Sequence, residues 1–88
     1  MDSEEALRVI RGLAKANRIR LTAHAEREAA EAGATRGDIR CALANATNIR
    51  RSGPGRPSDW TVVGPDLDGD DLQLALIIED GLLAITVY

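Results

Sequence analysis

The chain contains one histidine, His24, and an arginine, Arg27, follows three positions later. Thr22 is a typical N-cap and the segment after it is rich in Ala, Glu and Arg, so a helix is expected there. Residues three apart share one helix face, which would place the imidazole beside the guanidinium. A neutral imidazole can act as a base near neutral pH while the guanidinium holds an anion. In the alternative, His24 only caps or packs, and Arg27 pairs with Glu31.

Other arginines are candidates for a phosphate-binding site. Arg50 and Arg51 are neighbours in a predicted strand, so their side chains are expected on opposite faces, at least one of them on the open side of the sheet. Together with Arg56 from the next loop, and with Arg18 or Arg20, they could clamp a phosphate group. In the alternative, they form an ordinary solvated sheet edge that charge protects from aggregation.

Charge is distributed unevenly along the 88 residues. Residues 1–56 hold all 11 basic residues and 7 acidic ones, a charge of +4, whereas residues 57–88 hold 7 acidic residues and no base, a charge of −7. The two halves either pair with each other or leave a basic patch for an anionic partner. One Trp, one Tyr and no Phe cannot build a multi-ring platform for stacking bases, but a phosphate backbone can still be bound.

Neither a metal nor a nucleotide cofactor is expected. The acidic segment Asp66–Asp71 has the order D-x-D-G-D-D rather than that of a calcium loop, and a solvated hairpin turn is favoured. The loop Gly53–Gly55 lacks the Lys-Ser/Thr of a phosphate loop. Cys41 has no partner for an internal disulfide and is expected in the core, which favours a reduced, cytoplasmic setting.

The elements that would position these residues are helices first and strands afterwards. Capping residues and apolar periodicity predict helices from Asp2 or Ser3 to about Asn17, over Ala23–Ala32, and from Thr35 to about Ala46. Alternation and turn residues predict strands at Asn48–Arg51, Trp60–Val63, Leu72–Glu79 and Leu82–Tyr88, and a short strand or an extended link at Arg18–Thr22. This order predicts a single α+β domain, 1–88, with N-terminal helices packed on one face of a roughly four-stranded antiparallel sheet. No apolar run is long enough for a membrane span, and the acidic N-terminus is unlike a secretory signal.

The run Leu21-Thr22-Ala23-His24-Ala25-Glu26-Arg27 resembles the helix motif of a family of small bacterial domains, in which His-Ala-x-x-Arg follows a short strand. The similarity extends over about residues 18–88, through the Asp38-Ile39 helix start, Trp60-x-Val62-x-Gly64 and Ile85-Thr86-Val87-Tyr88. That family is grouped with the RelE and BrnT toxins of bacterial toxin–antitoxin pairs. The chain departs from the motif because its spacing is His-Ala-x-Arg, which leaves Glu28 at the family's arginine position.

The resemblance implies a RelE-like fold and metal-independent RNA cleavage through attack by the ribose 2′-hydroxyl, blocked by an antitoxin protein. His24 would then be the acid/base, Arg27 and Arg50 or Arg51 would hold the scissile phosphate, and Tyr88 would assist. Further RNA contacts would come from Arg18, Arg20 and Arg56. In the alternative, the chain is a non-catalytic module that keeps the fold and binds a protein partner, or a subunit of a larger regulatory assembly.

Overall fold

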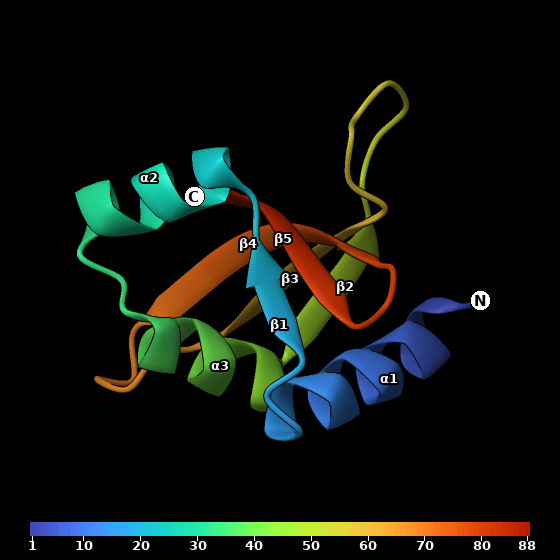
Figure 1. The fold of residues 1–88 in the computed structure, drawn as a ribbon. Helices are drawn as coiled ribbons and strands as arrows, with labels where there is room; N and C mark the ends of the chain where they lie inside the picture. Colours follow the sequence, from blue (N-terminus) through green and yellow to red (C-terminus); the bar gives the residue numbers. More distant parts are fainter.

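Three helices and five strands follow one another in the computed structural model, which describes residues 1–88 (Figure 1). The helices are α1 (Ser3–Lys15), α2 (Ala23–Ala32) and α3 (Arg36–Ala44). The strands are β1 (Ile19–Leu21), β2 (Asn48–Arg51), β3 (Trp60–Pro65), β4 (Asp71–Ile78) and β5 (Leu82–Val87). The predicted α+β class is confirmed, and no helix has the length and apolar character needed to cross a bilayer.

Helix starts follow the capping residues that the sequence offers. The Asp2 carboxylate accepts the Glu5 N–H at 2.8 Å, and the Thr22 hydroxyl accepts the Ala25 N–H at 3.1 Å. Gly33 ends α2 in the left-handed conformation, with φ of 72°, which suits a residue without a Cβ. Both bounds of α2 are those predicted, because local hydrogen bonds alone determine them.

The sheet has five strands in the order β1-β5-β4-β3-β2, and it is mixed rather than purely antiparallel. The prediction of about four antiparallel strands is corrected by β1, which pairs in parallel with β5. β1 precedes the helices α2 and α3, and these carry the chain to the opposite edge of the sheet, where β2 begins. Ile19 of β1 faces the core beside Leu82 of β5, and the burial of this side chain stabilises the short strand in the sheet.

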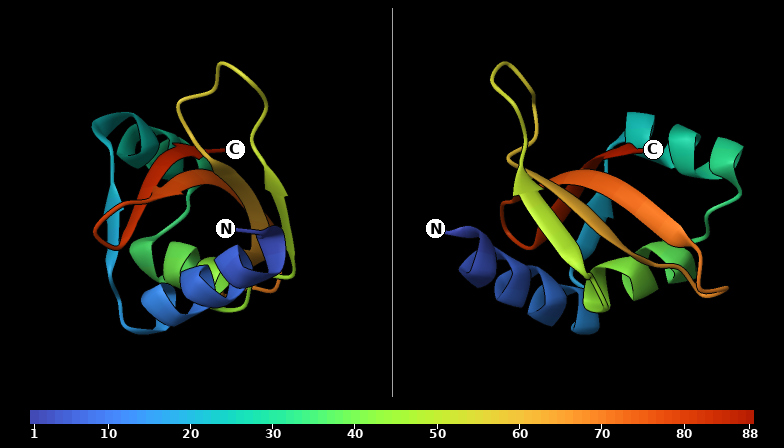
Figure 2. Two further views of the ribbon diagram at one scale, coloured as in Figure 1. Left: turned by 90° about the vertical axis from the view of Figure 1, so that its right-hand side faces the viewer. Right: turned by 180° about the vertical axis from the view of Figure 1, so that it is seen from behind.

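The core lies between the sheet and the pair α1 and α3, which lie together on one side of it (Figure 2). Its largest buried side chains are aliphatic and come from both layers: Ile10, Ile39, Leu43, Val62, Leu74, Leu76 and Leu82. Cys41 was predicted in the core but is only half-buried, because α3 turns Ile39, Ala42 and Leu43 inward and leaves Cys41 toward its outer side.

Asp38 fastens the start of α3 to the turn between β3 and β4. Its carboxylate accepts the Thr35 N–H at 2.9 Å and the Thr35 hydroxyl at 3.0 Å, and its other oxygen accepts the Leu67 N–H at 3.1 Å. The hydrogen bonds from the Thr35 and Leu67 backbone lower the pKa of Asp38 below its ordinary value of 3.8. The charged form therefore stabilises the fold above the unfolded-state pKa, and this contribution is lost as pH falls through the lower folded-state pKa.

We expect Asp38→Asn to lower the melting temperature at pH 7, because an amide has one acceptor oxygen for the two backbone N–H groups. As pH falls below about 4, the wild type loses the same contribution, so the two melting temperatures converge. Thermal unfolding followed by circular dichroism between pH 2.5 and 7 measures this difference. Asp68→Asn, an exposed change in the same turn, serves as the control, and a gap that stays constant with pH would refute the assignment.

Candidate functional site

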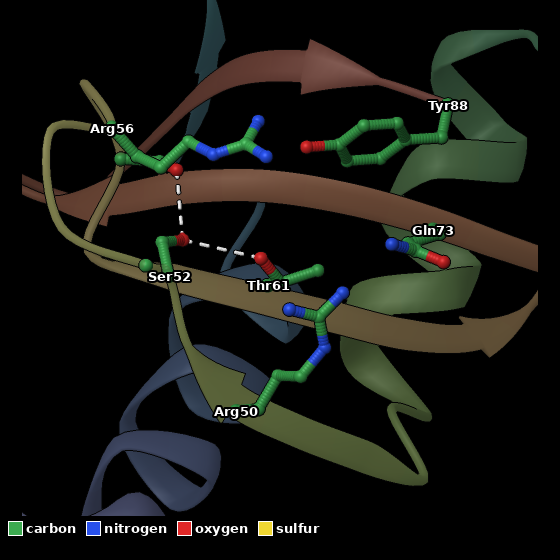
Figure 3. A pocket seen from close by; sticks show the side chains of 8 residues that line it. Arg50, Ser52, Arg56, Thr61, Gln73 and Tyr88 are labelled. Carbon is green, nitrogen blue, oxygen red and sulfur yellow. Dashed lines mark hydrogen bonds between the residues drawn. The ribbon is translucent and has the colours of Figure 1, made fainter.

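A polar hollow of about 280 Å³ lies on the sheet face opposite α1 and α3 (Figure 3). The loop between β2 and β3 forms one wall, and the C-terminal end of β5 forms another. The eight residues that line it are Arg50, Ser52, Gly53, Arg56, Ser58, Thr61, Gln73 and Tyr88. None of them is acidic, so the positive charge of the two arginines is not balanced within the hollow.

Strand alternation decides which of the two neighbouring arginines reaches the hollow. Arg50 pairs with Thr61, whose side chain is on the open face, and both residues line the hollow. Arg51 pairs with Trp60, and its guanidinium carbon lies 4.5 Å from the centroid of that ring. The Arg51 guanidinium also donates a hydrogen bond to the Met1 carbonyl. The two side chains thus point to opposite faces, as predicted, and Arg51 is absent from the hollow.

Tyr88 reaches the open face because β5 contains a β-bulge. Leu74 and Leu76 are two positions apart on β4. Their partners on β5, Val87 and Ala84, are three positions apart, so β5 carries one extra residue. A bulge of this kind reverses the side on which the following residues lie. Val87 is therefore buried like Ala84, and Tyr88 is turned toward the hollow rather than into the core.

Three hydroxyl groups form the floor of the hollow and hold its loop wall. The Ser52 Oγ lies 2.8 Å from the Ser58 Oγ and 3.1 Å from the Thr61 Oγ1, and Ser58 and Thr61 are buried. Three hydroxyls carry three protons but share only two contacts, so one O–H remains free to donate to a ligand. The Ser52 N–H also donates to the Asp59 carbonyl at 2.9 Å, which closes the base of the loop.

Hydrogen bonding separates the arginines into two groups. Six are held by main-chain carbonyls or by Asp80: Arg11, Arg18, Arg20, Arg36, Arg40 and Arg51. The guanidinium groups of the other four make no hydrogen bond or ion pair with the protein: Arg8, Arg27, Arg50 and Arg56. Two of these four line the hollow, and their guanidinium groups point into it together with the Tyr88 hydroxyl (Figure 3).

His24 and Arg27 lie on α2 and do not line the hollow. The His24 Nε2 contacts the Glu28 Oε1 at 3.2 Å, and the same oxygen accepts the Val87 N–H at 3.1 Å. Arg27 is exposed and forms no ion pair, so the pairing with Glu31 considered from the sequence is absent. The polar contact of the His24 side chain is thus with Glu28, one helical turn later.

Arg18 and Arg20 lie at the opposite edge of the sheet from Arg50. Three strands separate β1 from β2 in the sheet order. Arg18 donates to the Asp80 carboxylate at 3.2 Å, and Arg20 donates to the Glu79 carbonyl, so both hold the turn between β4 and β5. Of the arginines expected to bind a phosphate together, the structure brings together Arg50 and Arg56 only.

Four polar residues that line the hollow were not predicted from the sequence as site residues: Ser52, Ser58, Thr61 and Gln73. The pairing of β2 with β3 would have identified Thr61 as the partner of Arg50 on the open face. The Asp66–Asp71 segment is a hairpin turn, as expected, in which the Asp66 Oδ1 accepts the N–H groups of Asp68 and Asp70, both at 2.9 Å. No three His, Cys, Asp or Glu side chains are grouped so as to hold a metal ion.

Comparisons with protein-family models, with curated proteins and with solved structures found no significant match for this chain. The chemistry of the hollow on the open face is therefore the main guide to function.

Proposed function

We propose that the hollow binds the phosphate backbone of a single-stranded RNA and that the chain is a RelE-like toxin domain which cleaves it. The observation that carries this proposal is the convergence of two arginines with unpaired side chains and one tyrosine on a hollow that no acidic side chain lines. The choice of RNA as the substrate and of the cytoplasm as the location rests on the resemblance of residues 18–88 to relatives of the RelE and BrnT toxins.

The donors in the hollow suit a phosphodiester. Guanidinium groups make forked, charge-assisted hydrogen bonds to phosphate oxygens, and Arg50 and Arg56 have no protein acceptor to give up on binding. The free hydroxyl proton of the Ser52, Ser58 and Thr61 group adds a third donor. A bound phosphate would thus meet positive charge from two elements, strand β2 and the loop that follows it.

Tyr88 suits the recognition of one unstacked base beside that phosphate. Its side chain belongs to a residue that is 55% exposed, so one ring face is accessible to a ligand. Single-stranded RNA offers bases that are free to stack on an aromatic ring, whereas bases in a duplex are already stacked. The amide of Gln73, on the same face, can both donate to and accept from a ribose 2′-hydroxyl.

In the proposed reaction, the ribose 2′-oxygen attacks the adjacent phosphorus while the bond from phosphorus to the 5′-oxygen breaks. The products are a 2′,3′-cyclic phosphate and a 5′-hydroxyl. Arg50 and Arg56 stabilise the charge that builds up on the phosphate oxygens. The Tyr88 phenol donates a proton to the departing 5′-oxygen and regains one from water. The 2′-hydroxyl proton passes to water, because no histidine, lysine or acidic side chain lines the hollow.

That same lack of a base favours a second candidate, in which the hollow binds without cleaving. Its ligand would then be an acidic segment of a partner protein, since carboxylates also match two guanidinium groups. In the first candidate such a segment acts as the antitoxin by occupying the hollow in place of RNA. Cleavage products therefore distinguish a nuclease from a pure interaction module, and competition by an acidic peptide is expected in both cases.

We expect Tyr88→Ala to weaken the binding of a fluorescein-labelled, eight-nucleotide single-stranded RNA by about tenfold, the contribution of one stacked base. Tyr88→Phe is the matched control: it keeps the ring and the affinity but loses the proton donor, so cleavage slows. Fluorescence anisotropy measures the affinity, and gel analysis of the product ends measures the cleavage.

A DNA of the same sequence lacks the 2′-hydroxyl and is expected to bind without being cut. Cleavage of this DNA, or RNA products that carry a 5′-phosphate, would contradict the mechanism. Wild-type protein that binds the RNA but leaves it intact would point to the second candidate, and wild-type protein that does not bind it would reject the RNA assignment.

A further inference from the structure

We propose that Glu28, oriented by His24, is a positioning residue that holds Tyr88 over the hollow. This inference rests on the proposed function for its consequence, but its geometry stands on the contacts between α2 and β5. It assigns His24 a role that acts through Glu28 and Tyr88 rather than on the ligand itself, in place of the acid/base role that the resemblance implies.

The outer edge of β5 is paired with another strand over only half of its length. β1 pairs with Leu82–Ala84 and then gives way to α2. From the Ala84 carbonyl onward, the main-chain groups at this edge of β5 form hydrogen bonds with Thr22 and α2 instead of with a strand. The Thr22 N–H donates to the Ala84 carbonyl at 3.0 Å, and the Thr22 hydroxyl donates to the Ile85 carbonyl at 3.3 Å.

Glu28 supplies the last of these edge contacts. On the inner side, the Tyr88 N–H donates to the Gln73 carbonyl of β4 at 3.0 Å. Hydrogen-bonding groups alternate between the two edges of an antiparallel strand, so the Val87 N–H points outward, away from β4. It donates to the Glu28 Oε1 at 3.1 Å, which gives a half-buried side chain on α2 a direct hold on the residue before Tyr88.

His24 keeps that carboxylate in place from one helical turn earlier. Its Nε2 lies 3.2 Å from the same Oε1 that accepts the Val87 N–H. His24 and Glu28 are four residues apart on α2, the spacing at which side chains on a helix meet. Two partners on one oxygen restrict the Glu28 rotamer, so the position of the acceptor for Val87 is defined.

The contact between Glu28 and Val87 matters because the bulge in β5, at Ile85, lies close to the C-terminal end of the strand. The bulge leaves Ile85 without a partner on β4, and only Thr86, Val87 and Tyr88 follow it. The orientation of Tyr88 toward the hollow therefore depends on contacts at the very end of the strand. Glu28 at the outer edge and Gln73 at the inner edge fix this end from both sides.

The first test measures the end of β5 without any ligand. We expect Glu28→Ala to speed hydrogen exchange of the Val87 amide by roughly fivefold to tenfold. We also expect it to shift the Tyr88 ring signals, which are easily assigned because the chain has one Tyr, one Trp, one His and no Phe. Glu31→Ala, an exposed change on the same helix, is the matched control and leaves both readouts unchanged.

Glu28→Gln retains an oxygen acceptor for the Val87 N–H and is expected to keep most of the protection. If Glu28→Ala does not fold, Glu28→Gln is the variant in which both readouts are measured. His24→Ala is expected to change both readouts in the same direction as Glu28→Ala, but less. Unchanged Val87 exchange and unchanged Tyr88 signals in Glu28→Ala would overturn the inference.

The second test asks whether Glu28 acts through Tyr88. Glu28→Ala is expected to weaken RNA binding by up to about tenfold, the loss expected for Tyr88→Ala. In the double variant the two losses do not add, because the ring that Glu28 positions is already gone. Additive losses would overturn the inference. If Tyr88→Ala binds RNA as tightly as the wild type, the stacking role of Tyr88 in the proposed function is wrong. Hydrogen exchange of the Val87 amide and the Tyr88 ring signals still decide whether Glu28 positions Tyr88.

Discussion

The double variant Arg50→Ala/Arg56→Ala is expected to bind single-stranded RNA about 100-fold more weakly than the wild type, or worse. Each charge-assisted hydrogen bond contributes about 1.5–3 kcal/mol, and every 1.4 kcal/mol is a factor of ten in affinity. Both guanidinium groups are exposed and have no protein partner, so their loss leaves the fold intact. Anisotropy titrations at several salt concentrations measure the affinity, and the slope of log affinity against log salt is expected to fall by about 1.4.

The chain offers a control with the same change of net charge. Arg8 and Arg27 are also exposed and unpaired, but neither lines the hollow. Arg8→Ala/Arg27→Ala is therefore expected to reduce RNA affinity by much less than the first pair. Equal losses in the two double variants would mean that the chain binds RNA through its overall charge and not through the hollow.

The same pair of variants tests the toxin role in cells. If the chain is an RNA-cleaving toxin, its expression in bacteria is expected to arrest growth, and Arg50→Ala/Arg56→Ala is expected to relieve that arrest. Arg8→Ala/Arg27→Ala should remain toxic. The reverse pattern would favour Arg27, the residue that the family resemblance assigns, over the arginines of the hollow.

Gly64→Ala is expected to destabilise the protein by about 3 kcal/mol or more, a large part of the stability of a small domain. A Cβ at Gly64 would lie 1.9 Å from the Ala42 carbonyl oxygen and 2.8 Å from its carbonyl carbon. Both atoms belong to the backbone of α3, so relief requires the helix to move away from β3. Such a loss corresponds to a fall in melting temperature of about 12 °C or more.

Urea unfolding, followed through the fluorescence of the buried Trp60, measures this effect. Gly12→Ala is the matched control, because a Cβ at Gly12 in α1 meets no atom within 4 Å. Alanine has the higher helix propensity, so this variant is expected to gain up to about 1 kcal/mol. A Gly64→Ala variant as stable as the wild type would show that α3 does not pack on β3 as closely as described.

The helices could be predicted from the sequence because their determinants are local. Thr22, Thr35 and Gly33 lie within a few residues of the groups they cap, and these residues set the bounds of α2 and the start of α3. The split of Arg50 and Arg51 between two faces also follows from the sequence, since alternation along a strand needs no partner. The α+β class follows from the order of these elements.

Features that depend on residues far apart in the chain could not be predicted in the same way. Strict alternation along β5 would have turned Tyr88 into the core, and only the bulge relative to β4 turns it toward the hollow. The parallel pairing of β1 with β5 separates Arg18 and Arg20 from Arg56, and it carries His24 to the edge of β5, where Glu28 binds it. Local sequence patterns are therefore enough to predict the elements and the face of each side chain within an unbroken strand. Which arginines meet and which way Tyr88 points depend on strand order and pairing register, because these arise from packing between distant segments.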